Sequence, residues 1–183
     1  MRMDHLKLTM PSAVALGMFD GMHIGHRRVI SRTVEIAKEQ GWQSVVYTFS
    51  NHPRSVFAQA PEPLMDAVQR EAVMRSLGVE RVDMVTFDRE MASLSPEAFL
   101  ESLTARYRLC AIVCGSDYTF GCKGAGNVDL LRELAPRFGY SLYVVPFVML
   151  EGEKVSSTRI REALSRGNSE LADKMLGKNC QTY

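Results

Sequence analysis

Two histidines near the N-terminus, His23 and His26, stand three residues apart in the glycine-rich stretch 16–26. If a helix begins there, this spacing lets both imidazoles point at one anion. Gly25 between them leaves room for a phosphate to approach the backbone. Imidazole N–H groups can bind oxygen atoms that gain charge in a reaction without acting as nucleophiles. The pair predicts a phosphate-binding loop, in which a polyphosphate would bias both imidazoles towards their charged form.

The same residues also fit a plain surface turn, with Asp20 capping the loop. Zinc is a weaker alternative because two ligands are too few. The position of the stretch, between an apolar run and a helical pattern, favours phosphate binding. A helix N-terminus there would offer unpaired N–H groups and a positive dipole end. Moreover, the sequence contains no P-loop or G-x-G-x-x-G pattern that could take this role instead.

A second polar cluster, VSSTRIR at 155–161, opens an amphipathic helical pattern. The hydroxyls of Ser157 and Thr158 can hold phosphate oxygens, and Arg161 offers a planar cation with several donors. Taken alone, the cluster could be an ordinary helix cap formed by Ser156 or Ser157. Nucleotidyl transfer needs contacts both to the α-phosphate and to the pyrophosphate leaving group. We therefore expect the two clusters to serve one reaction.

The elements that must position these clusters alternate along the chain. Apolar runs rich in branched residues predict buried strands at 13–18, 44–49, 82–87, 109–114 and 141–145. Helical patterns lie at 24–40, 66–77, 96–107, 128–138, 157–166 and 169–176. This alternation predicts an α/β fold with a doubly wound parallel sheet of about five strands and helices on both faces. Ligands then bind beyond the carboxyl ends of the strands.

The stretch 50–63 contains three prolines and little regular pattern, so we expect a long loop that forms a lid or a pocket wall. The 183 residues suffice for one domain. A formal charge of +1 gives no bulk attraction to nucleic acid or an anionic membrane. No apolar run is long enough for a membrane span, and no signal-peptide core is present, so a cytoplasmic location is expected. The four cysteines show no zinc-binding spacing.

Four segments resemble the adenylyltransferase domain of bacterial bifunctional riboflavin kinase/FAD synthetases, a branch of the HxGH nucleotidyltransferase superfamily. They are LGMFDGMHIGH at 16–26, TFSNHP at 48–53, GSDYTFG at 115–121 followed by KGAG, and VSSTRIREAL at 155–164. The first and last segments recur in several nucleotidyltransferases, whereas the middle two look specific to FAD synthetases. The resemblance extends along essentially the whole chain.

The resemblance implies a single Rossmann-like domain over residues 1–183 that transfers AMP from ATP to FMN and releases FAD and pyrophosphate. Mg²⁺ would arrive with ATP, and no metal site of the protein itself is implied. The implied catalytic residues are His23, His26 and Arg161. The implied ATP contacts are Gly17, Phe19, Gly21, Gly25, Ser157 and Thr158. The implied flavin or nucleotide pocket contains His52, Pro53, Asp117, Tyr118 and Phe120.

Some residues depart from the family pattern. Asn51 stands where the family usually has proline, Tyr118 where phenylalanine is common, and Met18 where asparagine or valine is common. These changes could alter the flavin wall. The sequence ends soon after Gly177, where the family's kinase domain would begin, so we expect no riboflavin kinase activity and a separate kinase that supplies FMN. Two alternatives stay open: transfer to another phosphate ester, and a nucleotide-binding module without turnover.

Overall fold

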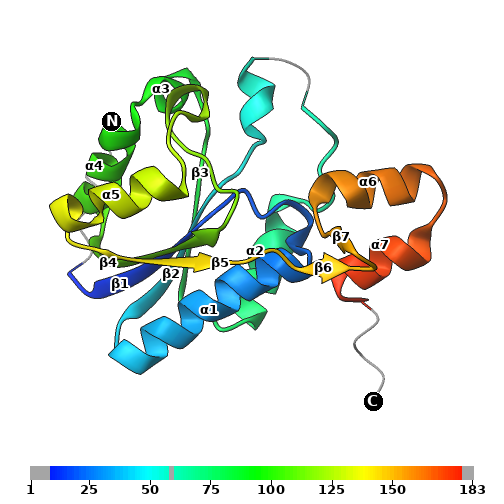
Figure 1. Cartoon of the computed structure of the whole chain (residues 1–183), viewed down its shortest axis with the longest axis horizontal. Helices are drawn as coiled ribbons and strands as arrows, with labels where there is room; N and C mark the ends of the chain where they lie inside the picture. The colour runs from blue at the N-terminus through cyan, green and yellow to red at the C-terminus, as the bar shows by residue number, and fades with distance from the viewer. Residues whose placement is uncertain (1–8, 58–59, 179–183) are drawn as a thin grey trace.

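A five-stranded parallel sheet forms the centre of the molecule in the computed structural model, which describes residues 9–57 and 60–178 (Figure 1). The strand order is β3-β2-β1-β4-β5. The order therefore runs in opposite directions from β1 and β4, which is the switch point of a doubly wound sheet. This confirms the predicted α/β fold. The strands are β1 (Pro11–Leu16), β2 (Gln43–Phe49), β3 (Arg81–Val85), β4 (Arg108–Gly115) and β5 (Ser141–Val145).

Helices cover both faces of this sheet, as predicted. Side chains of β1 alternate between two cores: Ala13 and Ala15 belong to one, and Val14 and Leu16 to the other. This alternation has the period of two that a strand imposes. Helices α1 and α2 contribute to the first core, and α4 and α5 to the second. These helices are α1 (Ile24–Gln40), α2 (Ala67–Ser76), α4 (Pro96–Arg106) and α5 (Val128–Phe138).

The predicted helix ends have a local chemical basis. Ser95 caps α4, since its hydroxyl accepts a hydrogen bond from the Ala98 N–H at 3.1 Å. Gly41 ends α1 and Gly139 ends α5, with φ values of 66° and 72°. Glycine adopts this left-handed conformation without the steric cost that a Cβ atom brings. The observed helices therefore end close to the predicted ranges 24–40, 96–107 and 128–138.

Two C-terminal helices, α6 (Ser157–Ser165) and α7 (Ser169–Leu176), form a smaller core beside the N-terminus of α1. Ile160 and Met175 are fully buried in it, and Ile24 and Leu64 pack against it. The sequence predicted both helices. It did not predict the shortest elements, which are η1 (Asp20–Met22), η2 (Pro53–Val56), α3 (Arg89–Ser93), η3 (Cys122–Gly124), β6 (Met149–Leu150) and β7 (Glu153–Lys154).

Among the helices of the described residues, none has the length and apolar character needed to cross a bilayer.

Candidate active site

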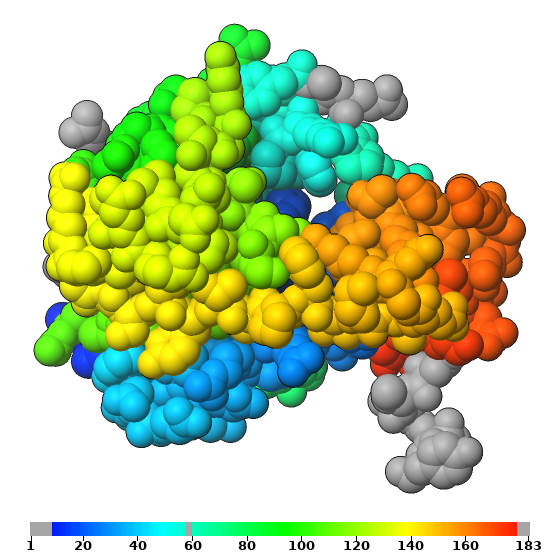
Figure 2. Space-filling model, in the orientation of Figure 1, coloured from blue at the N-terminus to red at the C-terminus, as the bar shows by residue number. Residues whose placement is uncertain are grey.

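A cavity of about 940 Å³ opens at the carboxyl ends of the strands. Its wall combines loops that follow β1, β2, β4 and β5 with the N-terminal turns of α1 and α6. Figure 2 shows the surface hollowed where the segments around residues 50–65, 115–125 and 146–160 meet. The site therefore lies where the predicted topology requires a ligand to bind.

The histidine loop leaves β1 and turns sharply into α1. Phe19 and Met22 adopt the left-handed region, with φ values of 51° and 46°. His23 then caps α1: its Nδ1 accepts a hydrogen bond from the His26 N–H at 3.2 Å. Residues 24 and 25 begin the helix, and N–H groups in a first turn have no carbonyl partner within the helix. The loop therefore presents the positive end of a 17-residue helix to the cavity.

The two imidazoles of this loop stack on each other. Their ring centroids are 3.5 Å apart with an interplanar angle of 21°. Both line the cavity, and His26 Nδ1 is buried without a hydrogen-bond partner among the described residues. Phe19 packs its ring edge-on against His26, with 5.5 Å between the centroids. The pair is held rigidly, and one of its polar atoms is left free for a ligand.

Burial controls the charge of this pair. It lowers the pKa of His23 to about 4, although Asp117 and Asp20 oppose the shift. Burial also lowers the pKa of His26 well below its ordinary value, and the charge of His23 adds to this effect. We expected a polyphosphate to favour the charged forms, whereas burial of the two imidazoles favours the neutral forms. The imidazoles are therefore neutral at pH 7 unless a bound anion raises their pKa values.

Asp20 joins the histidine loop to two segments that are distant in sequence. Its carboxylate accepts a hydrogen bond from the Leu64 N–H at 3.0 Å and forms an ion pair with Arg161. Its backbone carbonyl accepts a hydrogen bond from Ser157 Oγ at 2.9 Å. Only 7% of Asp20 is exposed. The residue is therefore more than a loop cap, and it brings the two predicted phosphate-binding clusters together.

Some residues of the C-terminal cluster line the cavity and others lie outside it. Ser156 and Ser157 line the cavity at the start of α6. Thr158 is exposed and is absent from the lining, and Arg161 uses its guanidinium to bind Asp20 and the Glu62 carbonyl at 2.9 Å. The structure thus places Ser157 in the cavity and Thr158 and Arg161 outside it. The roles assigned to these three residues stay predictions.

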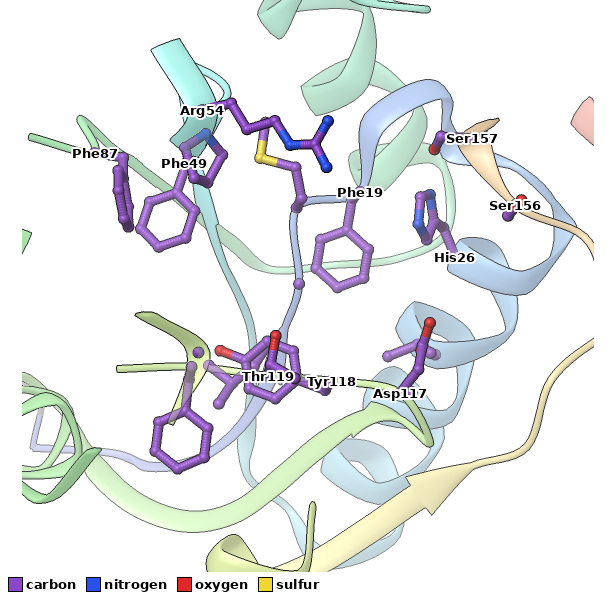
Figure 3. A pocket seen from close by; sticks show the side chains of 18 of the residues that line it. Phe19, His26, Phe49, Arg54, Phe87, Asp117, Tyr118, Thr119, Ser156 and Ser157 are labelled. Carbon is purple, nitrogen blue, oxygen red and sulfur yellow. The ribbon is translucent and has the colours of Figure 1, made fainter. Parts of the chain in front are cut away.

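The other end of the cavity is aromatic (Figure 3). Phe49 and Phe87 meet edge to face with centroids 4.9 Å apart. Tyr118 and Phe120 lie parallel at 5.9 Å. Both of these last two residues, and Pro53, were predicted for the pocket. Phe49 and Phe87 were not, because a strand end and a loop phenylalanine look like core residues in the sequence.

His52 and Gly21 lie beside the cavity and not in its lining. His52 Nδ1 accepts a hydrogen bond from the Arg54 N–H at 3.1 Å and so caps η2. A Cβ atom on Gly21 would come within 2.8 Å of the Leu64 side chain. Gly17 does line the cavity, and a Cβ atom there would lie 2.8 Å from the Phe19 ring. These glycines are needed for the close packing of the loop.

Asn51, where the family pattern has proline, joins the loop after β2 to Phe87 in the cavity wall. Its Nδ2 donates to the Phe87 carbonyl at 2.9 Å, and its Oδ1 accepts from the Phe87 N–H at 2.8 Å. The amide therefore binds both backbone groups of Phe87, as a neighbouring strand would. A proline could form neither bond. This departure has a structural role that the motif comparison did not reveal.

Arg70 is a further residue that sequence reasoning missed. It is 3% exposed, and its guanidinium donates to the carbonyls of Met18 at 2.9 Å and Phe49 at 2.8 Å. These carbonyls follow β1 and end β2, so one side chain holds both strand ends beneath the cavity. Nothing in the sequence distinguishes this arginine from an exposed helix charge.

The described lining of the cavity is strongly cationic. It contains a single carboxylate, Asp117, and four cations: Arg54, Arg89, Lys123 and Lys154. Lys154 binds Asp117 at 2.5 Å, and its ammonium lies 4.0 Å from the centroid of the Phe147 ring. The whole chain carries only +1, so positive charge is concentrated at this site. Such a field attracts polyanions.

The described residues contain no group of three or more His, Cys, Asp or Glu side chains placed to hold a metal ion.

The doubly wound sheet, the stacked histidines and the two helix N-termini meet at one cationic cavity that suits a polyphosphate ligand. A family model described as FAD synthetase matches residues 6–159. The chain belongs to the FAD synthetase family.

Relatives of this chain carry related names. It is 35% identical over 171 residues to a bifunctional riboflavin kinase/FMN adenylyltransferase of Listeria monocytogenes, covering 90% of this chain and 53% of that protein. A protein from Geobacillus thermodenitrificans named as a putative enzyme of the same kind is 36% identical, with 93% of this chain and 92% of that protein covered. A Listeria monocytogenes FAD synthetase is 31% identical, with 91% and 68% covered.

The chain spans about half the length of several bifunctional relatives that it matches. One solved structure is also similar, a crystal structure named as a macrolide-efflux protein from Streptococcus pneumoniae. It has a TM-score of 0.83 and 31% identity, and the match covers 93% of this chain and 56% of that one.

Proposed function

We propose that this chain is an FMN adenylyltransferase, which transfers AMP from ATP to FMN and forms FAD and pyrophosphate. We further propose that residues 1–183 act as one nucleotidyltransferase domain. The observation that supports this best is the division of the cavity into a polar end at the histidine loop and α6 and an aromatic end at Phe49, Phe87 and Tyr118. The two ends suit a triphosphate and a flavin ring. The volume of about 940 Å³ lies at the upper end of the usual range for ligand pockets, roughly 300–1,000 Å³.

The reaction requires no nucleophile from the protein. A phosphate oxygen of FMN attacks the α-phosphorus of ATP and forms the new P–O bond. The bond from the α-phosphorus to the oxygen bridging it to the β-phosphorus breaks, and pyrophosphate leaves with that electron pair. The protein's contribution is to align the two substrates and to stabilise the charge that develops on phosphate oxygens.

His23 and His26 would bind oxygens of the α-phosphate together with the first N–H groups of α1. Ser156, Ser157 and the N-terminus of α6 would hold the departing β- and γ-phosphates. Loss of one such donor typically reduces the rate roughly 10²- to 10³-fold. Mg²⁺ would enter with ATP and neutralise phosphate charge while it is held mainly by phosphate oxygens.

The test is direct. The purified chain is incubated with FMN, ATP and Mg²⁺, and FAD is followed by chromatography alongside pyrophosphate release. We expect FAD formation at least about 100-fold above that of the His26→Ala variant. Equal yields from the two proteins would contradict the proposal. Pyrophosphate release with another phosphate ester but not with FMN would assign a different acceptor, and nucleotide binding without pyrophosphate release would indicate a binding module.

A further inference from the structure

Three cations of the cavity lining, Arg54, Arg89 and Lys123, have no side-chain partner among the described residues. Arg54 belongs to η2, and no ion pair or hydrogen bond joins its guanidinium to another described residue. Its backbone N–H donates to His52, and its carbonyl accepts from the Phe57 N–H. Arg70 and Arg161, by contrast, use their guanidinium groups to bind backbone carbonyls or a carboxylate. Arg54 lines the cavity and is exposed to it. An arginine of this kind is available to a ligand.

The position of Arg54 separates the two ends of the cavity. Figure 3 shows its guanidinium in the space between the rings of Phe49 and Phe87 on one side and His26 and Ser157 on the other. Burial lowers the pKa of His52, and the charges of Arg161 and Arg54 lower it further, although the charge of Asp20 opposes them. The place of the Arg54 guanidinium in the cavity, between its aromatic and its polar end, is what makes it available to a ligand group that joins the two ends.

The proposed reaction needs a cation at this place. The flavin ring belongs at the aromatic end, and the phosphate of the same molecule must reach the α-phosphate of ATP at the histidine loop. That phosphate lies between the two ends, where two anionic groups approach each other. A guanidinium offers paired N–H donors that match phosphate oxygens, and its charge offsets the repulsion between the substrates.

Other positive groups lie close to the histidine loop, where ATP would bind. The N-termini of α1 and α6 and the Lys154 ammonium meet at the polar end of the cavity. Arg54 comes from the loop after β2 and faces that end from the flavin side. We propose that Arg54 binds the phosphate of the flavin acceptor and makes the site select FMN over riboflavin. This inference rests on the proposed adenylyltransferase function.

Flavin binding tests the inference without turnover. Quenching of flavin fluorescence is titrated with FMN and with riboflavin, in the presence of Mg²⁺ and a nonhydrolysable ATP analogue, for the wild type, Arg54→Met and Arg54→Lys. We expect the wild type to bind FMN more tightly than riboflavin. Arg54→Met should lose at least tenfold in affinity for FMN, while its affinity for riboflavin stays within twofold of the wild type. The FMN affinity of Arg54→Lys should lie between those of the wild type and Arg54→Met. In turnover, the KM for FMN should rise about tenfold and the KM for ATP should change less than twofold.

Arg89→Met is the matched control, because Arg89 is a second cation of the same cavity without a side-chain partner among the described residues. Arg54 lowers the pKa of His52, whereas Arg89 contributes to the pKa shift of none of the three histidines His23, His26 and His52. Removing it should change FMN and riboflavin affinity by similar factors. An Arg89→Met variant that loses FMN selectivity as fully as Arg54→Met would overturn the inference in favour of a general field effect.

The outcomes separate this inference from the proposed function. Absence of FAD formation by the wild type, together with selective FMN binding that depends on Arg54, would contradict the adenylyltransferase activity and support the role of Arg54. FAD formation by the wild type, together with unchanged FMN selectivity in Arg54→Met, would support the adenylyltransferase activity and contradict the role of Arg54. A wild type that binds FMN and riboflavin equally, or binds neither, would overturn the role of Arg54.

Discussion

At the scale of single residues, the sequence identified groups whose chemistry is visible in their type and spacing. His23 and His26 could be predicted because three residues of helix place them together and because they follow a strand. Arg70 and Asp20 could not, since their partners lie up to 141 residues away and depend on the folded backbone. Spacing also could not show that Arg161 turns towards Asp20 and that Ser157 turns towards the cavity.

The Asp20–Arg161 pair should contribute substantially to stability. Asp20→Asn removes the charge that Arg161 faces in a poorly exposed place, where the side chains are 9% and 25% exposed. We expect the free energy of unfolding to fall by about 2–4 kcal/mol, because an arginine is left with a weakened partner away from bulk water. Asp129→Asn is the control, since its ion pair with Arg132 is exposed and should contribute less than about 1 kcal/mol. Urea unfolding measures both, and equal losses would contradict the prediction.

The buried histidines should make stability depend on pH. The pKa of His23 is about 4 in the folded protein and that of His26 is also lowered, against 6.5 in the unfolded chain. Below pH 6.5 the unfolded chain therefore binds more protons than the folded protein, so stability is fully present above that pH and falls as the pH drops towards 4. Each histidine contributes up to about 1.4 kcal/mol per pH unit. Urea unfolding between pH 5 and 7 should show a smaller slope for His26→Gln than for the wild type, and identical slopes would count against the burial of this imidazole.

At the scale of elements, long periodic segments were predicted well and short ones were not. Helices α1 and α5 have a repeating apolar face and glycine ends, so their limits follow from local chemistry. The two-residue strands β6 and β7 and the three-residue η1 contain too few residues for any periodicity. They form because the surrounding chain fixes their ends. These short pieces carry Asp20 and Lys154, so the finer geometry of the site was the part that the sequence could not predict.

The loop after β2 is positioned by one amide. Asn51 binds the N–H and carbonyl of Phe87, which in turn packs its ring against Phe49. Asn51→Ala leaves both backbone groups without that partner and frees Phe87 to move. We expect the KM for FMN to rise about three- to tenfold while the KM for ATP changes less than twofold, as measured by steady-state FAD formation. Ser55→Ala, which removes a different side-chain contact of Asn51, should leave both KM values within twofold. A change confined to the KM for ATP would show that this wall does not serve the flavin.

At the scale of the whole molecule, the fold brings the histidine loop and the start of α6, which are far apart in the sequence, to one cavity. The sheet supplies the frame, which was predicted from apolar runs that alternate with helical patterns. Helix α6 then returns to the histidine loop through hydrogen bonds that span 137 and 141 residues. Prediction of a shared site from the sequence rested on chemistry: two phosphate-binding clusters are useful together only if they meet. The separation of the clusters in sequence gave no geometric guide to how they would meet.

This arrangement predicts that ATP stabilises the histidine loop and the start of α6 together. A triphosphate that contacts the N-termini of α1 and α6 binds only when both are folded, so a concentration 100 times the Kd should add about 2.7 kcal/mol to the free energy of unfolding. For a domain of this size the Tm should rise by about 5–10 °C. Hydrogen exchange followed by mass spectrometry should show ATP protecting peptides around residues 23–27 and 156–160 to a similar degree. In Asp20→Asn, where the tie between the two ends is weakened, protection of 156–160 should fall more than that of 23–27. Protection limited to one of the two peptides in the wild type would mean that the histidine loop and α6 do not share a nucleotide.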